Sequence, residues 1–126
     1  AGSGERGDAD GVGDAAEFCG PRGLATSPDG SALFVADWSN HLAKIRRVEV
    51  ATGAVTTLAG SGEEGDADGV GDAAEFDGPF GVALSSDASA LFVADLDNHK
   101  IRRVEVATGA VTTIARSGGW RWRRSR

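Results

Sequence analysis

Aspartates recur at fixed spacing in a glycine-rich segment. Residues 7–18 read GDADGVGDAAEF, and residues 65–76 repeat them letter for letter. Closely spaced carboxylates on such a loop can bind calcium, but this run lacks the twelve-residue EF-hand spacing and its terminal glutamate ligand. The alternative, which we favour, is a folded loop in which aspartates cap backbone amides and residues 72–76 form a capped helical turn. The calcium candidates are Asp8, Asp10, Asp14, Asp66, Asp68 and Asp72.

His41 and His99 each follow an asparagine at corresponding positions. An acid–base or metal-binding role is conceivable for histidine. Because these residues recur in each copy, we expect a structural hydrogen bond that holds the turn, with the preceding aspartate as one candidate acceptor. The single cysteine, Cys19, cannot form an intrachain disulfide, and Asp77 replaces it in the second copy. We interpret it as an incidental thiol.

The two copies differ at a few positions where a ligand could bind. Arg22 of the first copy corresponds to Phe80, and Trp38 corresponds to Leu96. None of the differences creates a nucleophile beside a base, whereas catalysis needs unlike groups that converge on one point. We therefore predict no catalytic residue, no cofactor and no enzymatic activity. Arg22, Phe80 and Trp38 are candidates for a ligand-binding face, near the mouth of a central channel.

The elements that position these residues belong to a doubled sequence. Besides the loop, residues 45–57 (IRRVEVATGAVTT) recur at 101–113, with Leu42 and Ala43 as a two-residue insertion in the first copy. A period of this length is typical of solenoids and propellers, whose units cannot bury their apolar faces alone. The pattern divides the chain into a first unit (1–58), a second unit (59–115) and a basic Trp/Arg tail (116–126).

Each unit contains four short apolar or β-branched segments separated by turns. In the second copy these are residues 80–86, 90–95, 100–106 and 110–114, with a bulge expected at Arg102–Arg103. Four such strands form an antiparallel meander, which is the unit of a β-propeller. We expect the insertion to lengthen the turn between the second and third strands. Phe18 and Phe76 are expected to plug the space between neighbouring units.

The motifs resemble the NHL repeat. They include PFGVA at 79–83, LFVAD at 91–95, DNHKIRRV at 97–104 and TGAVTT at 108–113, and most have counterparts in the first copy. The resemblance implies an all-β fold with two four-stranded propeller blades per chain, in a six-bladed ring. Two blades leave apolar end faces uncovered, so we predict that three chains close the ring as a homotrimer by head-to-tail packing. Four chains with eight blades, or a piece of a longer covalent propeller, are the alternatives.

Charge and composition narrow the remaining function classes. The net charge is −6, and five of the 13 basic residues lie in the tail. An acidic body repels phosphate, which disfavours nucleic-acid binding. The tail could stack on nucleic acid or lie on an anionic membrane, although pairing with the acidic ring or terminal disorder is favoured. No apolar run approaches the roughly 20 residues of a membrane span.

The leading functional hypothesis is a non-enzymatic NHL-type scaffold or binding module built from identical two-blade chains. It would offer a propeller face to a protein or small-molecule ligand. The absence of methionine indicates an excised, processed or engineered chain, and the near-identical copies fit a recent or engineered duplication. The alternative is a fragment of a larger NHL-repeat enzyme or receptor whose active residues lie outside this chain. The sequence indicates neither a specific ligand nor a cellular compartment.

Overall fold

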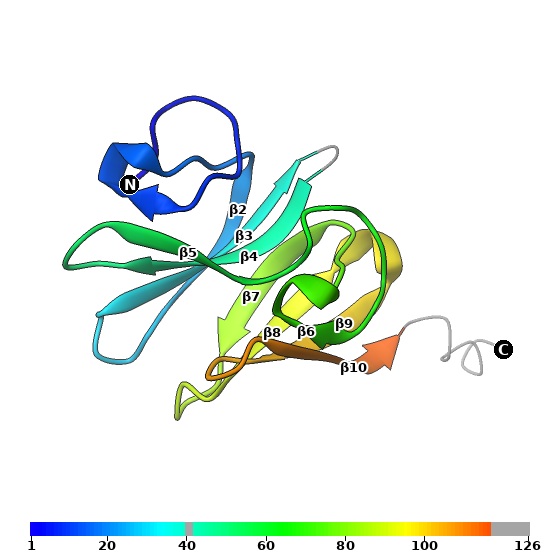
Figure 1. Cartoon of the computed structure of the whole chain (residues 1–126). Coiled ribbons are helices and arrows are strands. Elements are labelled where there is room, and N and C mark those ends of the chain that lie inside the picture. Colours follow the sequence, from blue (N-terminus) through cyan, green and yellow to red (C-terminus); the bar gives the residue numbers. More distant parts are fainter. Residues whose placement is uncertain (40–41, 117–126) are drawn as a thin grey trace, which may run out of the picture.

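The computed structural model describes residues 1–39 and 42–116, which fold into two antiparallel sheets lying side by side (Figure 1). The first sheet has the order β1-β5-β4-β3-β2, and the second has the order β6-β10-β9-β8-β7. The strands of the first sheet are β1 (Gly11–Val12), β2 (Pro21–Thr26), β3 (Ala32–Ser39), β4 (Leu42–Glu49) and β5 (Ala54–Ala59). Those of the second are β6 (Gly69–Val70), β7 (Pro79–Leu84), β8 (Ala90–Asp95), β9 (Lys100–Glu105) and β10 (Ala110–Arg116).

Each sheet is the predicted four-stranded meander with one addition. The glycine-rich loop contributes a two-residue strand, β1 or β6, that pairs with the fourth long strand. The prediction of four strands per blade was therefore one short, because nothing in the sequence of Gly11–Val12 distinguishes a strand from the surrounding loop. The all-β architecture and the two consecutive blades are confirmed.

The helical turns in the loops are 3₁₀ helices: η1 (Gly13–Ala15), η2 (Gly71–Ala73) and η3 (Leu96–Asn98). The predicted capped turn at residues 72–76 was wrong in position and in capping. Val70 occupies the N-cap of η2 with no side-chain hydrogen bond, and Asp72 lies inside the helix. The loop instead takes its shape from its pairing with β10 and from a parallel bridge between Glu64 and Phe76.

Two further local predictions were wrong. The register of β8 against β9 is regular through Arg102 and Arg103, and the irregularity lies in β10, between Thr113 and Ala115. The insertion does not lengthen a turn, because Leu42 and Ala43 are strand residues that pair with Ser39 and Trp38. The first hairpin is thus longer than its counterpart: β3 and β4 each have 8 residues, whereas β8 and β9 have 6.

The main core lies between the two sheets. Phe76, from the loop that leads into the second blade, is completely buried there, as predicted for an inter-blade plug. Phe34 and Ile45 of the first blade and Leu91 and Val93 of the second belong to the same cluster. A smaller cluster beneath the N-terminal loop contains Ala16, Val35, Val48 and Val55. The contact between blades therefore holds most of the buried apolar side chains.

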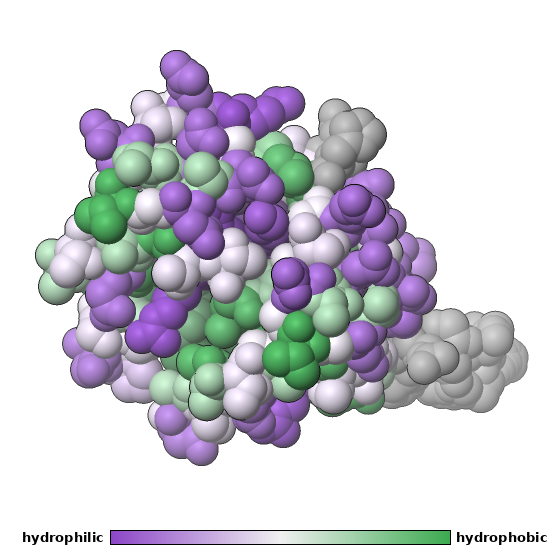
Figure 2. Space-filling view, in the orientation of Figure 1, coloured by the Kyte–Doolittle hydropathy of each residue, from purple (hydrophilic) through white to green (hydrophobic). Residues whose placement is uncertain are grey.

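The inner edges of the blades touch closely. A Cβ atom at Gly23 of β2 would lie 2.2 Å from the carbonyl oxygen of Phe80 in β7, so only glycine fits there. At the other end of the seam, Gly109 has a φ of 77° and a Cβ there would lie 2.6 Å from the carbonyl oxygen of Leu58. The face of the molecule seen in Figure 2 carries apolar residues in separate patches among polar ones.

Candidate functional site

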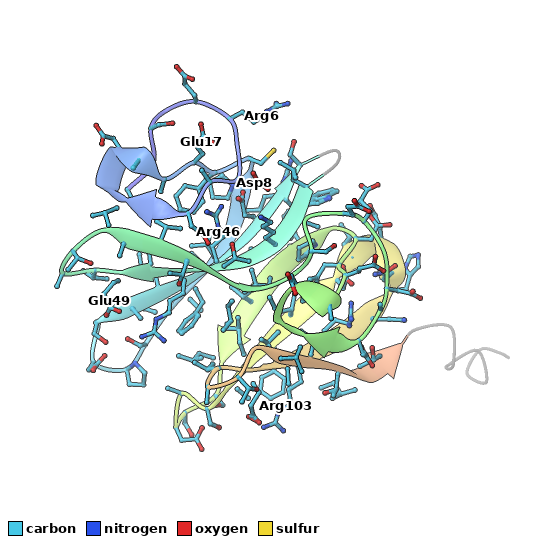
Figure 3. All side chains as sticks on the ribbon, in the orientation of Figure 1. Arg6, Asp8, Glu17, Arg46, Glu49 and Arg103 are labelled. Atoms are coloured by element: carbon cyan, nitrogen blue, oxygen red, sulfur yellow. The ribbon has the colours of Figure 1, made fainter. Side chains whose placement is uncertain are left out.

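A buried arginine in each blade fixes the acidic loop onto the sheet. Nη1 of Arg46 donates to Oδ2 of Asp37 at 2.9 Å and to the carbonyl oxygen of Glu17 at 2.9 Å. Its Nη2 donates to the carbonyl oxygen of Ala9 and to Oδ1 of Asp10, each at 3.0 Å. Figure 3 shows Arg46 beneath the N-terminal loop that carries Asp8 and Glu17. The guanidinium therefore connects strand, loop and carboxylates at one point.

The second blade repeats this arrangement. Arg102 contacts Asp95 at 2.8 Å and Asp68 at 3.0 Å, together with the carbonyl oxygens of Glu75 and Ala67. Each buried arginine also lies over a phenylalanine, with 4.9 Å between the guanidinium carbon of Arg102 and the ring centroid of Phe76. Two copies of such a network, with the same donors and acceptors, indicate a structural element of the blade.

The calcium candidates divide into three pairs. Asp8 and Asp66 form ion pairs with Lys44 and Lys100, at 2.9 and 3.1 Å. The hydrogen bond from the lysine, aided by its charge, holds the pKa of each of these two carboxyls below the usual value. The second pair binds the buried arginines, and the third lies on the exposed 3₁₀ helices. Within the described residues the six carboxylates therefore do not gather into a metal-binding cluster.

Asp10 and Asp68 are the members of the second pair. Oδ1 of Asp68 accepts hydrogen bonds from Nη2 of Arg102 and from the hydroxyl of Thr113, at 3.0 and 2.9 Å. Partial burial acts to raise the pKa of Asp68, but the Thr113 and Arg102 hydrogen bonds outweigh it and the pKa is lowered. Asp14 and Asp72 are exposed on η1 and η2.

Within residues 1–39 and 42–116, no three His, Cys, Asp or Glu side chains gather in a geometry that could hold a metal ion.

The ligand-face candidates lie at the inner edge of the blades. The guanidinium carbon of Arg22 is 4.6 Å from the centroid of the Trp38 ring, and Nε of Arg22 donates to the carbonyl oxygen of Trp38 at 3.0 Å. Phe80, on the adjacent strand β7, is 49% exposed. The structure thus brings Arg22 and Trp38 together and places Phe80 on the neighbouring inner strand. A guanidinium held in this way can bind a planar anion through its remaining N–H groups.

One residue between the glycine-rich loop and the innermost strand differs in charge between the two copies: Cys19 corresponds to Asp77. Asp77 has a raised pKa because of its burial and the nearby charges of Glu64, Asp97 and Asp95. In the first copy the corresponding residue is Cys19, whose thiol is free. The backbone N–H of Cys19 donates to Oδ1 of Asp37 at 2.9 Å. Among the described residues, no base lies in hydrogen-bond contact with that thiol.

At His99 the backbone, and not the imidazole side chain, makes the hydrogen bond that holds the turn. His99 is exposed, with a φ of 56°, and it is its backbone N–H that closes the turn on the carbonyl oxygen of Leu96, at 3.2 Å. The neighbouring Asn98 makes the side-chain contact instead, donating from Nδ2 to Oδ2 of Asp95 at 2.7 Å. His41 and the tail from residue 117 lie outside the described residues.

Sequence reasoning missed Arg46 and Arg102, which are fully buried. The available signal was the break in apolar alternation at the paired arginines, which we assigned to a bulge. The LFVAD motif occurs in both copies and ends in Asp37 or Asp95. An inward-facing arginine that binds this aspartate explains the break in alternation.

The described residues line depressions in the surface. One, of about 350 Å³, lies across the blade seam and is lined by Phe34 and Arg47 of the first blade and by Ala88 and Val106 of the second. Another, of about 460 Å³, is lined by the first residues of the chain together with Arg6, Phe18 and Cys19. The structure shows no helix, within its described residues, with the length and apolar character required for a membrane crossing.

Comparison with known proteins identifies relatives of the repeats, although no family model matches the chain. NHL repeat-containing protein 2 of Homo sapiens is 34% identical over 109 residues, covering 86% of this chain and 15% of that protein. Its Bos taurus counterpart is 36% identical with the same coverage. Protein SUPPRESSOR OF QUENCHING 1, chloroplastic, of Arabidopsis thaliana is 37% identical over 108 residues, covering 86% of this chain and 10% of that protein.

Solved structures agree on the fold. An auxiliary nutrient binding protein from Bacteroides ovatus matches with a TM-score of 0.64 and 24% identity, over 88% of this chain and 27% of that chain. One from Bacteroides thetaiotaomicron matches with a TM-score of 0.58 and 22% identity, over 73% and 24%. The chain spans only 10% to 15% of the length of the sequence relatives described above. The paired sheets and these matches together support the resemblance of the two repeats to NHL-repeat proteins with a β-propeller-type fold.

Proposed function

We propose that this chain is a non-enzymatic scaffold or binding module that closes with identical chains into a six-bladed, homotrimeric NHL-type propeller. The ring presents loop-lined faces to a protein or small-molecule ligand. One observation carries the proposal: repeated residues that are buried where the two blades meet are exposed on the two free faces of the chain. Because both blades have nearly the same sequence, the inter-blade contact within the chain is a template for the missing contacts.

The free face of the second blade exposes apolar residues whose counterparts in the first blade lie at the inter-blade contact. Ile45 is 0% exposed, whereas Ile101, its repeat, is 39% exposed. Leu58 packs against the inter-blade core, whereas the corresponding Ile114 is 54% exposed. Burial of one such side chain stabilises a contact by about 1.5–3 kcal/mol. This face therefore carries the same kind of apolar residues that another blade covers within the chain.

The free face of the first blade exposes the complementary set. Phe76 is completely buried between the blades, but the corresponding Phe18 is only half-buried. Val106 packs against the inter-blade core, and its repeat, Val50, is 52% exposed. A first blade docked on the second blade of another chain would place Phe18 where Phe76 lies within the chain. The contact is thus head-to-tail, and it closes into a ring when the rotation per chain allows.

The absence of catalysis belongs to the same proposal. Alike blades place like groups at intervals around an axis, whereas catalysis needs unlike groups at one point. The networks at Arg46 and Arg102 are engaged in holding their loops, and each repeats the other. The near-identical copies also fit a recent or engineered duplication, in which loops have had little time to specialise.

Two variants test the assembly. Ile101→Glu places a charge on the free face of the second blade, and we expect sedimentation velocity to show it as a single chain. Val70→Glu is the matched control, because Val70 and its repeat Val12 are 58% and 59% exposed, so the blade contact covers neither. The control should sediment like the unmodified trimer. Equal sedimentation of both variants and the unmodified protein would contradict the proposed interface.

A second candidate is a segment of a larger NHL-repeat enzyme or receptor. The observation that favours it is coverage, since the relatives are many times longer than the stretch they share with this chain. Further blades of the same polypeptide would then cover the two free faces, with any active residues on those blades. A monomeric mass for this chain at micromolar concentration favours this candidate over self-assembly.

A further inference from the structure

Arg22 is held at the inner edge of the first blade by two contacts with one residue. Its guanidinium lies 4.6 Å from the centroid of the Trp38 ring, and its Nε donates to the Trp38 carbonyl oxygen at 3.0 Å. Trp38 is itself fixed, since its backbone N–H donates to the carbonyl oxygen of Gly20 at 2.9 Å. A stacked and hydrogen-bonded guanidinium loses less conformational freedom when it binds a ligand than a freely rotating one.

The Arg22 fork keeps its terminal donors available. Nη1 and Nη2 of Arg22 have no hydrogen-bond or ion-pair partner among residues 1–39 and 42–116, and the side chain is exposed. The comparable arginines of the blades are engaged: Arg46 and Arg102 are buried in ion pairs, and Arg103 contacts Glu105 at 3.3 Å.

An exposed aromatic ring lies on the adjacent strand. Backbone contact between Gly23 and Phe80 brings β2 and β7 together beside Arg22, and Phe80 is 49% exposed. The inner edge therefore combines a planar cation with an apolar surface. The second blade has Phe80 and Leu96 at the positions of Arg22 and Trp38, so the cation occurs once per chain.

We propose that Arg22, positioned by Trp38, together with Phe80 forms a binding site for an aromatic carboxylate. The planar carboxylate matches the two-pronged guanidinium donor, and the ligand ring contacts Phe80. The acidic body favours a singly charged anion over a multiply charged phosphate, because repulsion grows with ligand charge. This inference rests on the proposed binding-module function but not on the trimer, since the three residues belong to one chain.

Calorimetric titration with benzoate tests the site. We expect the unmodified protein to bind benzoate in the millimolar range and to show no binding of benzyl alcohol, which lacks the charge. Arg22→Phe installs the residue that the second repeat has at this position, and we expect it to weaken benzoate binding about tenfold or more. Arg22→Lys should also weaken binding, because it keeps the charge and removes the fork.

Arg47→Ala is the matched control, since Arg47 is a partly exposed arginine away from this site, 3.7 Å from Glu49. It should bind benzoate like the unmodified protein. No heat of benzoate binding up to about 10 mM, or equal affinity in Arg22→Phe, overturns the proposal. Sedimentation of the same samples separates this result from assembly, because a benzoate-binding monomer contradicts only the trimer and a non-binding trimer contradicts only the site.

Discussion

Arg46 and Asp37 form an ion pair of 2.9 Å in which the side chains are 0% and 2% exposed. Arg102 and Asp95 repeat it at 2.8 Å with both side chains completely buried. Burying two charges costs several kcal/mol each. It is tolerated here because the terminal Nη1 and Nη2 donors of Arg46 also reach loop carbonyl groups and a second carboxylate, although its Nε has no hydrogen-bond partner among the described residues. The buried arginine of each blade therefore binds both the sheet and the long loop, and it fixes the loop onto the blade.

Replacing Arg102 should destabilise the protein strongly. Arg102→Leu leaves Asp95 buried without its cation, and we expect the free energy of unfolding in urea to fall by about 3–5 kcal/mol. Arg103→Leu is the matched control, because its side chain is 42% exposed and its ion pair with Glu105 is at the surface. The control should stay within about 1 kcal/mol of the unmodified protein. Both variants are compared at one protein concentration, since the proposed self-assembly would contribute to stability. Equal losses of unfolding free energy in the two variants would show that the buried ion pair does not contribute more stability than the surface pair.

Calcium should not stabilise the loops. Asp68 already accepts hydrogen bonds from Arg102 and Thr113, so a calcium ion would have to displace a buried cation. We expect no change in melting temperature in millimolar calcium. Without calcium, Asp68→Asn should cost about 1 kcal/mol or more, whereas Asp72→Asn, on an exposed 3₁₀ helix, should stay within about 0.5 kcal/mol. A calcium-dependent rise in melting temperature that Asp68→Asn abolishes would contradict this assignment.

Most of the strand pattern could be predicted from the sequence because it depends on local signals. The LFVAD segments are short apolar runs bounded by turns, and β8 (Ala90–Asp95) has the predicted bounds. The repeat also predicted that Phe76 would lie between blades, where the structure places it. These features depend on periodicity and burial, which a sequence displays directly.

The features that could not be predicted depend on long-range contacts. The break in alternation at Arg102–Arg103 has two local explanations, a bulge or a buried charge, and only the placement of Asp95 and of the loop distinguishes them. Likewise, Val70 pairs with Ala110 because the whole loop folds back on β10. The contact between Arg22 and Trp38 joins the start of one strand to the end of another, so residue spacing alone does not reveal it.

Two turn aspartates should make stability depend on pH below 4. Asp29 has its pKa lowered to about 2 by the backbone N–H of Ser31, aided by the hydroxyls of Ser31 and Ser27. Asp87 has its pKa lowered to about 2 in the same way, first by the backbone N–H of Ser89. Because the folded pKa lies below the unfolded value, this stabilisation is present above about pH 4 and is lost as the pH falls to about 2.

Urea unfolding at several pH values checks this dependence. The double variant Asp29→Asn with Asp87→Asn should show a smaller loss of stability between about pH 4 and pH 2 than the unmodified protein. Asp72→Asn serves as the control, and its pH dependence should follow that of the unmodified chain. If the double variant loses stability with the unmodified slope, other groups carry the acid sensitivity.

The mass of the unmodified chain in solution tests the central claim most directly. In the proposed assembly, another chain covers the repeated residues that are exposed at the free faces, and a six-bladed ring of two-blade chains contains three chains. Light scattering on a size-exclusion column, over a micromolar concentration series, should give three times the mass of one chain. A mass of one chain across that series would contradict the self-assembled propeller.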